Sequence, residues 1–332
     1  MRVLHGEEAH LKIAIVGAGV IGCIFGHLYR RAGHYVLLID ADSGRVRTLS
    51  GPGVTLELPD GSETRVGGPA TSYPLARGIG PFDLVQVSVK GYDTARAAED
   101  LLPLLGPRTA VLSVQNGLGN LELLAAAAGP ERIIGGVTAH SGQAVSAGRV
   151  RWAGGAGPLL AIGPFAPVPG LRLGPVLERL AASLSALGFE VETLEDVAPA
   201  LWRKLIANVS TNPLAALTGR TAAQLLASPY LCRLIDLLAA EAATVARARG
   251  LVFPELTRPG EFCRRALAAA RDNKISMLQD VEARKPTEIG SLNEALCREG
   301  TRLGVQTPAH HVITLLVRAL EERLPTAPVD ER

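Results

Sequence analysis

The chain has 332 residues, 47% hydrophobic and 20% charged, a composition typical of a globular protein long enough to form two domains. Its 34 basic and 32 acidic residues leave a net charge of +2, which argues against nucleic acid or an anionic membrane as a partner. The sequence contains no uninterrupted run of 18 apolar residues, so we predict no membrane span. The first eleven residues lack the apolar core of a signal peptide, and we therefore expect a cytoplasmic protein.

The segment 12–40 has the order of a dinucleotide-binding unit. An apolar run at 13–16 predicts a buried parallel strand, and a glycine-rich turn, a helical pattern and a second apolar run at 35–39 follow it. Asp40 ends this second run, at about the place where an acid binds the 2′-hydroxyl of a ribose. The alternative is a glycine-rich turn in another kind of α/β unit, which would not require the acid.

The three glycines of this turn have the spacing G-x-G-x-x-G, and each has a separate expected role. Gly17 permits the tight turn, Gly19 lets the backbone approach a pyrophosphate, and Gly22 lets the helix pack against the strand. The helix N-terminus offers N–H groups and a partial positive charge to the pyrophosphate. The predicted cofactor-binding loop therefore consists of Gly17, Ala18, Gly19, Val20, Ile21 and Gly22.

Strands and helices continue to alternate up to about residue 195. A β-hairpin is predicted from 54–58 and 64–66, because Pro59-Asp60-Gly61-Ser62 between them is a turn signal. The other predicted strands are 83–89, 109–114, 133–139, 148–152, 159–162 and 190–193, and the predicted helices are 43–49, 94–105, 121–128 and 171–187. This alternation predicts a doubly wound, Rossmann-type sheet with ligands at the carboxyl ends of its strands.

The pattern becomes helical after Glu195. Apolar residues at intervals of three and four predict helices at 198–217, 229–250, 259–283, 287–303 and 308–323. We therefore predict an α/β fold with a dinucleotide-binding Rossmann domain at 1–195 and an all-α substrate-binding and catalytic domain at 196–332. The residues before the first strand are expected to fray and 325–332 to be disordered. The sequence leaves open whether the apolar helices pack internally or form a homodimer interface.

The four cysteines, Cys23, Cys232, Cys263 and Cys297, have no C-x-x-C spacing and no nearby group of histidines. We interpret them as idle or buried thiols in a reducing compartment and predict no metal site.

Lys204, Asn208 and Asn212 are spaced four apart, so a helix would place them along one face. Their surroundings are largely apolar, and polar side chains on such a helix need partners, which a bound polar substrate would supply. The alternative is a solvent-facing stripe, although asparagine is a poor choice on a free helix surface. Because proline restricts the residue before it, Asn212 is expected to cap or kink the helix at Pro213.

A second polar region contains Ser276 and, after Pro286, the pair Thr287-Glu288. Considered alone, Ser276 is equally compatible with a serine on a helix surface. Glu288 is equally compatible with an acid in the first turn of a helix, where the helix dipole favours it.

Together these features resemble the ketopantoate reductase (2-dehydropantoate 2-reductase) family over about 12–324. The resemblance rests on the glycine loop, Val89-Lys90, Gln115-Asn116-Gly117, the K-x-x-x-N-x-x-x-N-P pattern and the string SMLQDVEARKPTEI. The last two are specific, and they occur in this order behind a Rossmann half.

The resemblance implies roles for five residues of the second half. Lys204 matches the catalytic lysine that donates a proton to the substrate carbonyl oxygen or polarises it. Glu288 matches a glutamate near the hydroxyl end of ketopantoate, and Asn208 and Asn212 match asparagines that hold substrate hydroxyl groups. Ser276 matches the serine that meets the substrate carboxylate.

The resemblance also places Lys90 and Asn116 at the mouth of the cofactor site, with Asn116 near the substrate as well. Family members that use NADPH commonly carry an arginine just past the second strand, where this chain has Asp40, with Arg45 and Arg47 following later. A carboxylate repels a 2′-phosphate and accepts hydrogen bonds from a free ribose diol. The residues therefore favour NADH, whereas the family favours NADPH.

The implied function is NAD(P)H-dependent reduction of ketopantoate to (R)-pantoate, a step toward pantothenate. Many members carry a further asparagine after the Asn-Pro step, which the segment 218–222 lacks, so a paralogue that reduces another 2-keto acid or oxidises a 2-hydroxy acid is the nearest alternative. A non-catalytic sensor of NAD(H) is a second alternative, but it would need no polar stripe on a helix. The string SMLQD argues against a relative of the 3-hydroxyacid or 6-phosphogluconate dehydrogenases.

Overall fold

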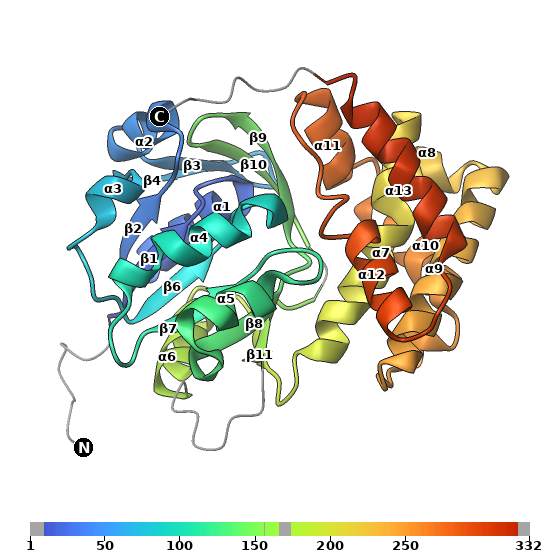
Figure 1. Ribbon diagram of the computed structural model, residues 1–332. Helices are drawn as coiled ribbons and strands as arrows, with labels where there is room; N and C mark the ends of the chain where they lie inside the picture. The colour runs from blue at the N-terminus through green and yellow to red at the C-terminus, as the bar shows by residue number, and fades with distance from the viewer. Residues whose placement is uncertain (1–9, 156, 166–173, 325–332) are drawn as a thin grey trace. The chain divides into compact units, whose positions relative to one another are not determined.

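The computed structural model describes residues 10–155, 157–165 and 174–324 (Figure 1). They form two compact units, one of the described residues up to Gln115 with Asn120–Val197, the other of Asn116–Gly119 with the described residues from Ala198 onward. The boundary predicted at 195 lies beside Val197. The predictions for 1–9 and 325–332, and the first residues of the helix predicted at 171–187, fall outside the described residues.

Within the described residues, eight strands of the first unit form one sheet in the order β12-β11-β8-β7-β6-β1-β2-β5. Six of them are parallel, while β11 runs antiparallel to β8 and carries β12 at the edge. The strands are β1 (Lys12–Val16), β2 (Tyr35–Ile39), β5 (Ala70–Thr71), β6 (Leu84–Val87), β7 (Ala110–Ser113), β8 (Ile133–Val137), β11 (Leu160–Pro164) and β12 (Val191–Thr193).

Both faces of this sheet are covered, as the side chains of β1 show. Ile13 and Ile15 pack in one apolar cluster with α1 (Val20–Arg31) and α6 (Gly174–Ser185). The alternate residues of β1 pack in a second cluster with α4 (Thr94–Asp100) and α5 (Asn120–Ala128). Alternation with a period of two places successive side chains on opposite faces, so the predicted doubly wound, Rossmann-type fold is confirmed.

A second sheet of the first unit has the order β4-β3-β10-β9 and supplies apolar side chains to the cluster around α1. The predicted hairpin is confirmed by the antiparallel pairing of β3 (Val54–Glu57) with β4 (Glu63–Val66). We did not predict β9 (Ser141–Ser146), which is polar and largely exposed and is a strand because it pairs with β10 (Arg149–Gly154).

Short helical elements complete the first unit. The helix predicted at 94–105 is wrong in its last turn, because α4 ends at Asp100 and a 3₁₀ turn containing Pro103 follows. The remaining elements are α2 (Ser43–Ser50), α3 (Tyr73–Ala76), η1 (Gly91–Asp93), η2 (Leu102–Leu104) and η3 (Pro130–Arg132).

The described part of the second unit is helical throughout, which confirms the all-α prediction. None of the helices in the described ranges is long and apolar enough to cross a membrane. The elements are α7 (Ala198–Thr218), α8 (Ala222–Leu226), α9 (Pro229–Ala248), η4 (Pro254–Leu256), α10 (Pro259–Ala270), α11 (Ser276–Glu282), α12 (Asn293–Arg302) and α13 (Pro308–Glu321).

Two helices predicted in the second unit are wrong in extent. The helix predicted at 259–283 is broken at Arg271, whose φ is 52°, and the carbonyls of Arg271 and Asn273 accept hydrogen bonds from the first turn of α8. The helix predicted from 287 begins only at Asn293, because the carbonyl of Glu288 accepts from the N–H groups of two residues that follow it and closes a turn.

Pro213 lies inside α7, so the helix continues past Asn212, and the prediction that Asn212 caps it is wrong; a kink there stays a prediction. A proline lacks the N–H that would bind the carbonyl four residues earlier, which is that of Val209. The side-chain amide of Asn293 donates to this carbonyl at 2.9 Å, so no buried acceptor is left unpaired there. The buried ring of His310 lies at hydrogen-bond distance from the same amide and fixes it in place.

Candidate active site

The glycine loop between β1 and α1 has the geometry that its sequence predicts. Gly17 has φ of 97°, and a Cβ there would lie 2.7 Å from the backbone nitrogen of Val89. A Cβ on Gly22 would lie 2.0 Å from the carbonyl oxygen of Gly17, so only glycine allows this close packing. Gly19 caps α1, and a Cβ built on it would meet no atom within 4 Å. The space beside Gly19 and the free N–H groups of the first helical turn fit a pyrophosphate.

Asp40 directly follows β2 and is buried, and its carboxylate ties the glycine loop to the next helix. Oδ2 accepts from the backbone N–H of Ala18 at 2.8 Å, and Oδ1 accepts from that of Asp42 at 2.9 Å. Arg45 Nη1 donates to both oxygens, at 2.9 and 2.8 Å. Asp40 therefore lies at the end of β2 beside the glycine loop, with an arginine already bound to it; its contact with a ribose stays a prediction.

Lys90 and Asn116 follow neighbouring strands of the sheet but belong to different units. Lys90 comes after β6 and caps the 3₁₀ turn η1 in the first unit. Asn116 comes after β7 and begins the four-residue stretch that belongs to the second unit. That stretch is anchored by the N–H of Leu118, which donates to the carbonyl of Ser291 at 2.8 Å, so the structure brings the Asn116 loop close to the Glu288 turn.

The predicted polar stripe lies on α7. Lys204 and Asn208 are half-buried and Asn212 is only 2% exposed, so the solvent-facing alternative is wrong for Asn212. The side chain of Asn208 makes no hydrogen bond within the described ranges. Helix α11 packs against α7, and its first residue is Ser276.

Asn212 and Ser276 are in contact, although 64 positions separate them in the sequence. The side-chain amide of Asn212 donates to Ser276 Oγ at 3.3 Å. The amide oxygen of Asn212 is buried and has no hydrogen-bond partner among the described residues. A buried acceptor of this kind is uncommon in a folded protein and is satisfied when a ligand donates to it.

Lys204 is near enough to Glu288 for the two charges to interact, and Glu288 is 6% exposed and lies in the turn before α12. Burial lowers the pKa of the Lys204 ammonium to about 8, and the negative charge of Glu288 opposes this shift because it favours the charged amine. The amine therefore carries a proton at neutral pH but gives it up far more readily than an exposed lysine does. A group with this pKa is suited to general acid catalysis.

The Glu288 turn is held by residues that the sequence analysis did not identify. Glu321 on α13 accepts hydrogen bonds from the backbone N–H and the hydroxyl of Thr287, at 2.7 and 2.6 Å. Ser291 binds the Asn116 loop through its backbone carbonyl, a group that every residue has. No local motif signals either contact, since both join segments far apart in the sequence.

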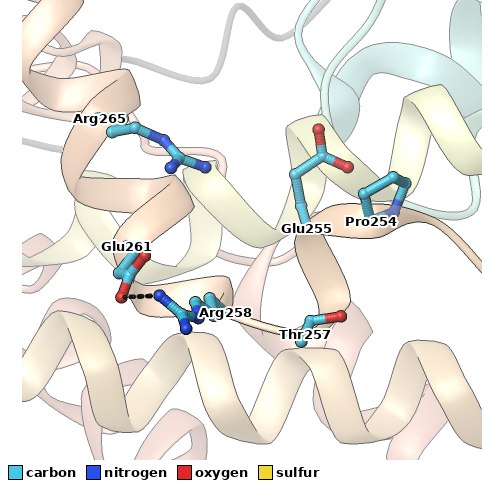
Figure 2. Close-up of a pocket in the computed structure, with 6 residues that line it drawn as sticks. All are labelled: Pro254, Glu255, Thr257, Arg258, Glu261 and Arg265. Atoms are coloured by element: carbon cyan, nitrogen blue, oxygen red, sulfur yellow. Dashed lines mark hydrogen bonds and ion pairs between the residues drawn. The ribbon is translucent and has the colours of Figure 1, made fainter.

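A pocket of about 200 Å³ lies elsewhere on the second unit, between η4 and the start of α10 (Figure 2). Three of its four charged lining residues form ion pairs: Arg258 with Glu261, and Glu255 with Arg203, which does not line the pocket. None of the predicted site residues lines it. The lining residues are Pro254, Glu255, Thr257, Arg258, Glu261 and Arg265.

Comparison with known proteins matches both halves of the chain. The family model described as Ketopantoate reductase PanE/ApbA matches residues 13–167, and the model of its C-terminal part matches residues 196–321. A 2-dehydropantoate 2-reductase of Archaeoglobus fulgidus is 28% identical over 94% of this chain and 99% of its own.

Solved structures of similar proteins cover the same length. A PanE/ApbA family ketopantoate reductase from Ralstonia eutropha JMP134 is 32% identical with a TM-score of 0.81, over 94% of this chain and 99% of its own. A D-mandelate dehydrogenase, solved with NADH and anilino(oxo)acetate, is 25% identical with a TM-score of 0.86, over the same shares of the two chains.

Proposed function

Because this chain belongs to the ketopantoate reductase family of oxidoreductases, we propose that it reduces ketopantoate to (R)-pantoate with NADH or NADPH. The observation that best supports a reductase is the half-buried residue Lys204: burial lowers the pKa of its amine to about 8, and the charge of Glu288 opposes this shift. We further propose that residues 1–195 bind the dinucleotide and residues 196–332 bind the keto acid. The proposed reaction takes place in the cytoplasm and is a step of pantothenate biosynthesis. Association as a homodimer stays a prediction.

In this proposal Lys204 is the general acid. When bound, a nicotinamide would supply the hydride for the C2 carbonyl carbon, and Lys204 would meet the negative charge that develops on the carbonyl oxygen. An ammonium group directed at that oxygen stabilises the charge and then donates its proton. The negative charge of Glu288 favours the protonated amine.

The other predicted site residues of the second unit are proposed to bind the substrate. Ser276 Oγ accepts from Asn212, which leaves the serine hydroxyl hydrogen available for the substrate carboxylate. The unpaired amide oxygen of Asn212 accepts from a substrate hydroxyl, and Asn208 and Asn116 supply further amide groups. Ketopantoate carries the carboxylate, carbonyl and hydroxyl that this set of groups requires.

We expect ketopantoate to have a kcat/KM at least about tenfold above that of 2-ketoisovalerate, because a site that hydrogen-bonds a hydroxyl discriminates strongly against an analogue lacking it. The measurement is a steady-state assay with NADH and NADPH over ketopantoate, 2-ketoisovalerate, pyruvate and phenylglyoxylate. 2-Ketoisovalerate is the matched control, since it lacks only the hydroxymethyl carbon and its hydroxyl. Equal values for these two acids would contradict the proposed substrate.

The second candidate function is that of a paralogue acting on another 2-keto or 2-hydroxy acid. The likeness to a D-mandelate dehydrogenase favours this alternative, and phenylglyoxylate is in the panel because it is the keto acid that corresponds to mandelate. A clear preference for phenylglyoxylate would support the paralogue. Failure of every keto acid, with tight dinucleotide binding, would support a non-catalytic NAD(H) sensor.

A further inference from the structure

The carboxylate of Asp40 is the group expected to hold the adenosine ribose, but its acceptor positions are occupied. A carboxylate has about four lone-pair positions, two on each oxygen. Within the described residues, Oδ2 accepts from Ala18 N–H and from Arg45, and Oδ1 accepts from Asp42 N–H and from Arg45, all at 2.8 to 2.9 Å. A ribose diol can therefore bind this carboxylate only if one of these donors leaves.

Arg45 is the donor that is able to leave. The other two are backbone N–H groups, of the glycine loop and of the residue that caps α2, and neither moves without moving its chain segment. Arg45 is instead a side chain on α2, and it is 28% exposed. Its ion pair with Asp40 rests on Nη1 alone, which donates to both carboxylate oxygens.

The opposite edge of the same guanidinium is available. Nη2 has only a long contact of 3.9 Å with the exposed carboxylate of Asp42, and neither Nη2 nor Nε donates a hydrogen bond within the described part of the chain. An arginine offers five N–H donors in a fixed plane, suited to the oxygens of a phosphate. The positive charge of Arg45 also offsets the repulsion between Asp40 and a phosphate.

We infer that Arg45 sets the choice between NADH and NADPH, because it occupies the carboxylate of Asp40 and keeps N–H groups free that suit the oxygens of a 2′-phosphate. With Arg45 in place, the site accepts NADPH despite the acid at the end of β2. Without Arg45, the carboxylate is free to bind a ribose diol and to repel a 2′-phosphate. This inference rests on the proposed dinucleotide site, and not on the identity of the keto acid.

The test is the pair of dissociation constants for NADH and NADPH, measured by nicotinamide fluorescence and by calorimetry without any keto acid. For Arg45→Ala we expect the ratio of the NADPH constant to the NADH constant to rise at least about tenfold, the usual scale for losing one charged contact to a ligand. Arg47→Ala is the matched control, since this arginine lies on the same helix and does not contact Asp40; its ratio should equal that of the wild type.

An unchanged ratio in Arg45→Ala, or an equal loss of affinity for both dinucleotides, would overturn the inference and leave Arg45 a purely structural role. If Arg45→Ala fails to fold, Arg45→Gln retains one donor to Asp40 without the charge, and the ratio should rise at least about threefold. The result is independent of the proposed activity: a protein that fails to reduce ketopantoate can still show the shift, and an active reductase with an unchanged ratio refutes only the role of Arg45.

Discussion

Replacing Lys204 by alanine is expected to lower kcat for ketopantoate reduction at least about a hundredfold, the usual contribution of a general acid, while the dissociation constants of NADH and NADPH stay within about twofold. The reason is that the variant removes the proton donor and the positive charge beside the carbonyl oxygen, and leaves the glycine loop unaltered. Stopped-flow kinetics and dinucleotide titration of the same preparation measure the two quantities.

Arg203→Ala provides the matched control for this variant. Arg203 is the preceding residue on α7 and also a cation, but it is exposed and pairs with Glu255. Removing an exposed ion pair costs about 0–1 kcal/mol, so kcat should change less than about threefold. Equal losses in the two variants would show that the effect comes from damage to α7 and not from the amine.

The pH dependence gives an independent check on Lys204. Its folded-state pKa is lowered to about 8, and the protonated amine is the form that donates. The kcat for reduction should therefore be constant below pH 8 and fall above it, whereas oxidation of pantoate, which needs the neutral amine, should rise over the same range. A reduction profile that stays flat well above this pKa would exclude Lys204 as the acid.

Two glycine variants separate dinucleotide binding from folding. In Gly19→Ala, φ of −72° suits alanine and the added methyl group meets no protein atom within 4 Å, so the melting temperature should be unchanged. The methyl group would occupy the space proposed for the pyrophosphate, and we expect the dissociation constant of NADPH to rise at least about tenfold. Calorimetric titration and thermal unfolding measure both.

Gly22→Ala should behave differently, because its methyl group would lie 2.0 Å from the carbonyl oxygen of Gly17. Relieving this clash moves the loop or the helix, and we expect a loss of about 1–3 kcal/mol in the free energy of unfolding together with weaker binding. Wild-type affinity for NADPH in Gly19→Ala would show that the pyrophosphate does not bind beside this glycine.

Elements with continuous apolar runs could be predicted from the sequence. Elements whose conformation depends on hydrogen bonds from another segment could not. β1 and β2 are buried strands bounded by glycines or polar residues, and their predicted ranges agree with the structure to within one residue. β9 has no apolar run and depends on β10 for its conformation. The break at Arg271 carries no glycine or proline to signal it, and it is stabilised by hydrogen bonds from α8.

The candidate site shows the same division. Spacing alone placed Lys204, Asn208 and Asn212 on one helix face, because the period of a helix is fixed. The pairing of Asp40 with Arg45 depends on a side-chain rotamer, and spacing does not encode it. The opposite error concerns Pro213: local sequence predicts an interrupted helix there, and the distant amide of Asn293 makes the interruption unnecessary.

The central claim is that the amine of Lys204 acts on the carbonyl of a bound 2-keto acid. A crystal structure of the protein with NADP⁺ and ketopantoate tests it most directly. The account predicts that Lys204 Nζ lies within about 3.2 Å of the C2 carbonyl oxygen, the reach of a proton-donating hydrogen bond, with Ser276 on the carboxylate. A complex in which Nζ points into solvent, or in which another side chain holds that oxygen, would contradict the account.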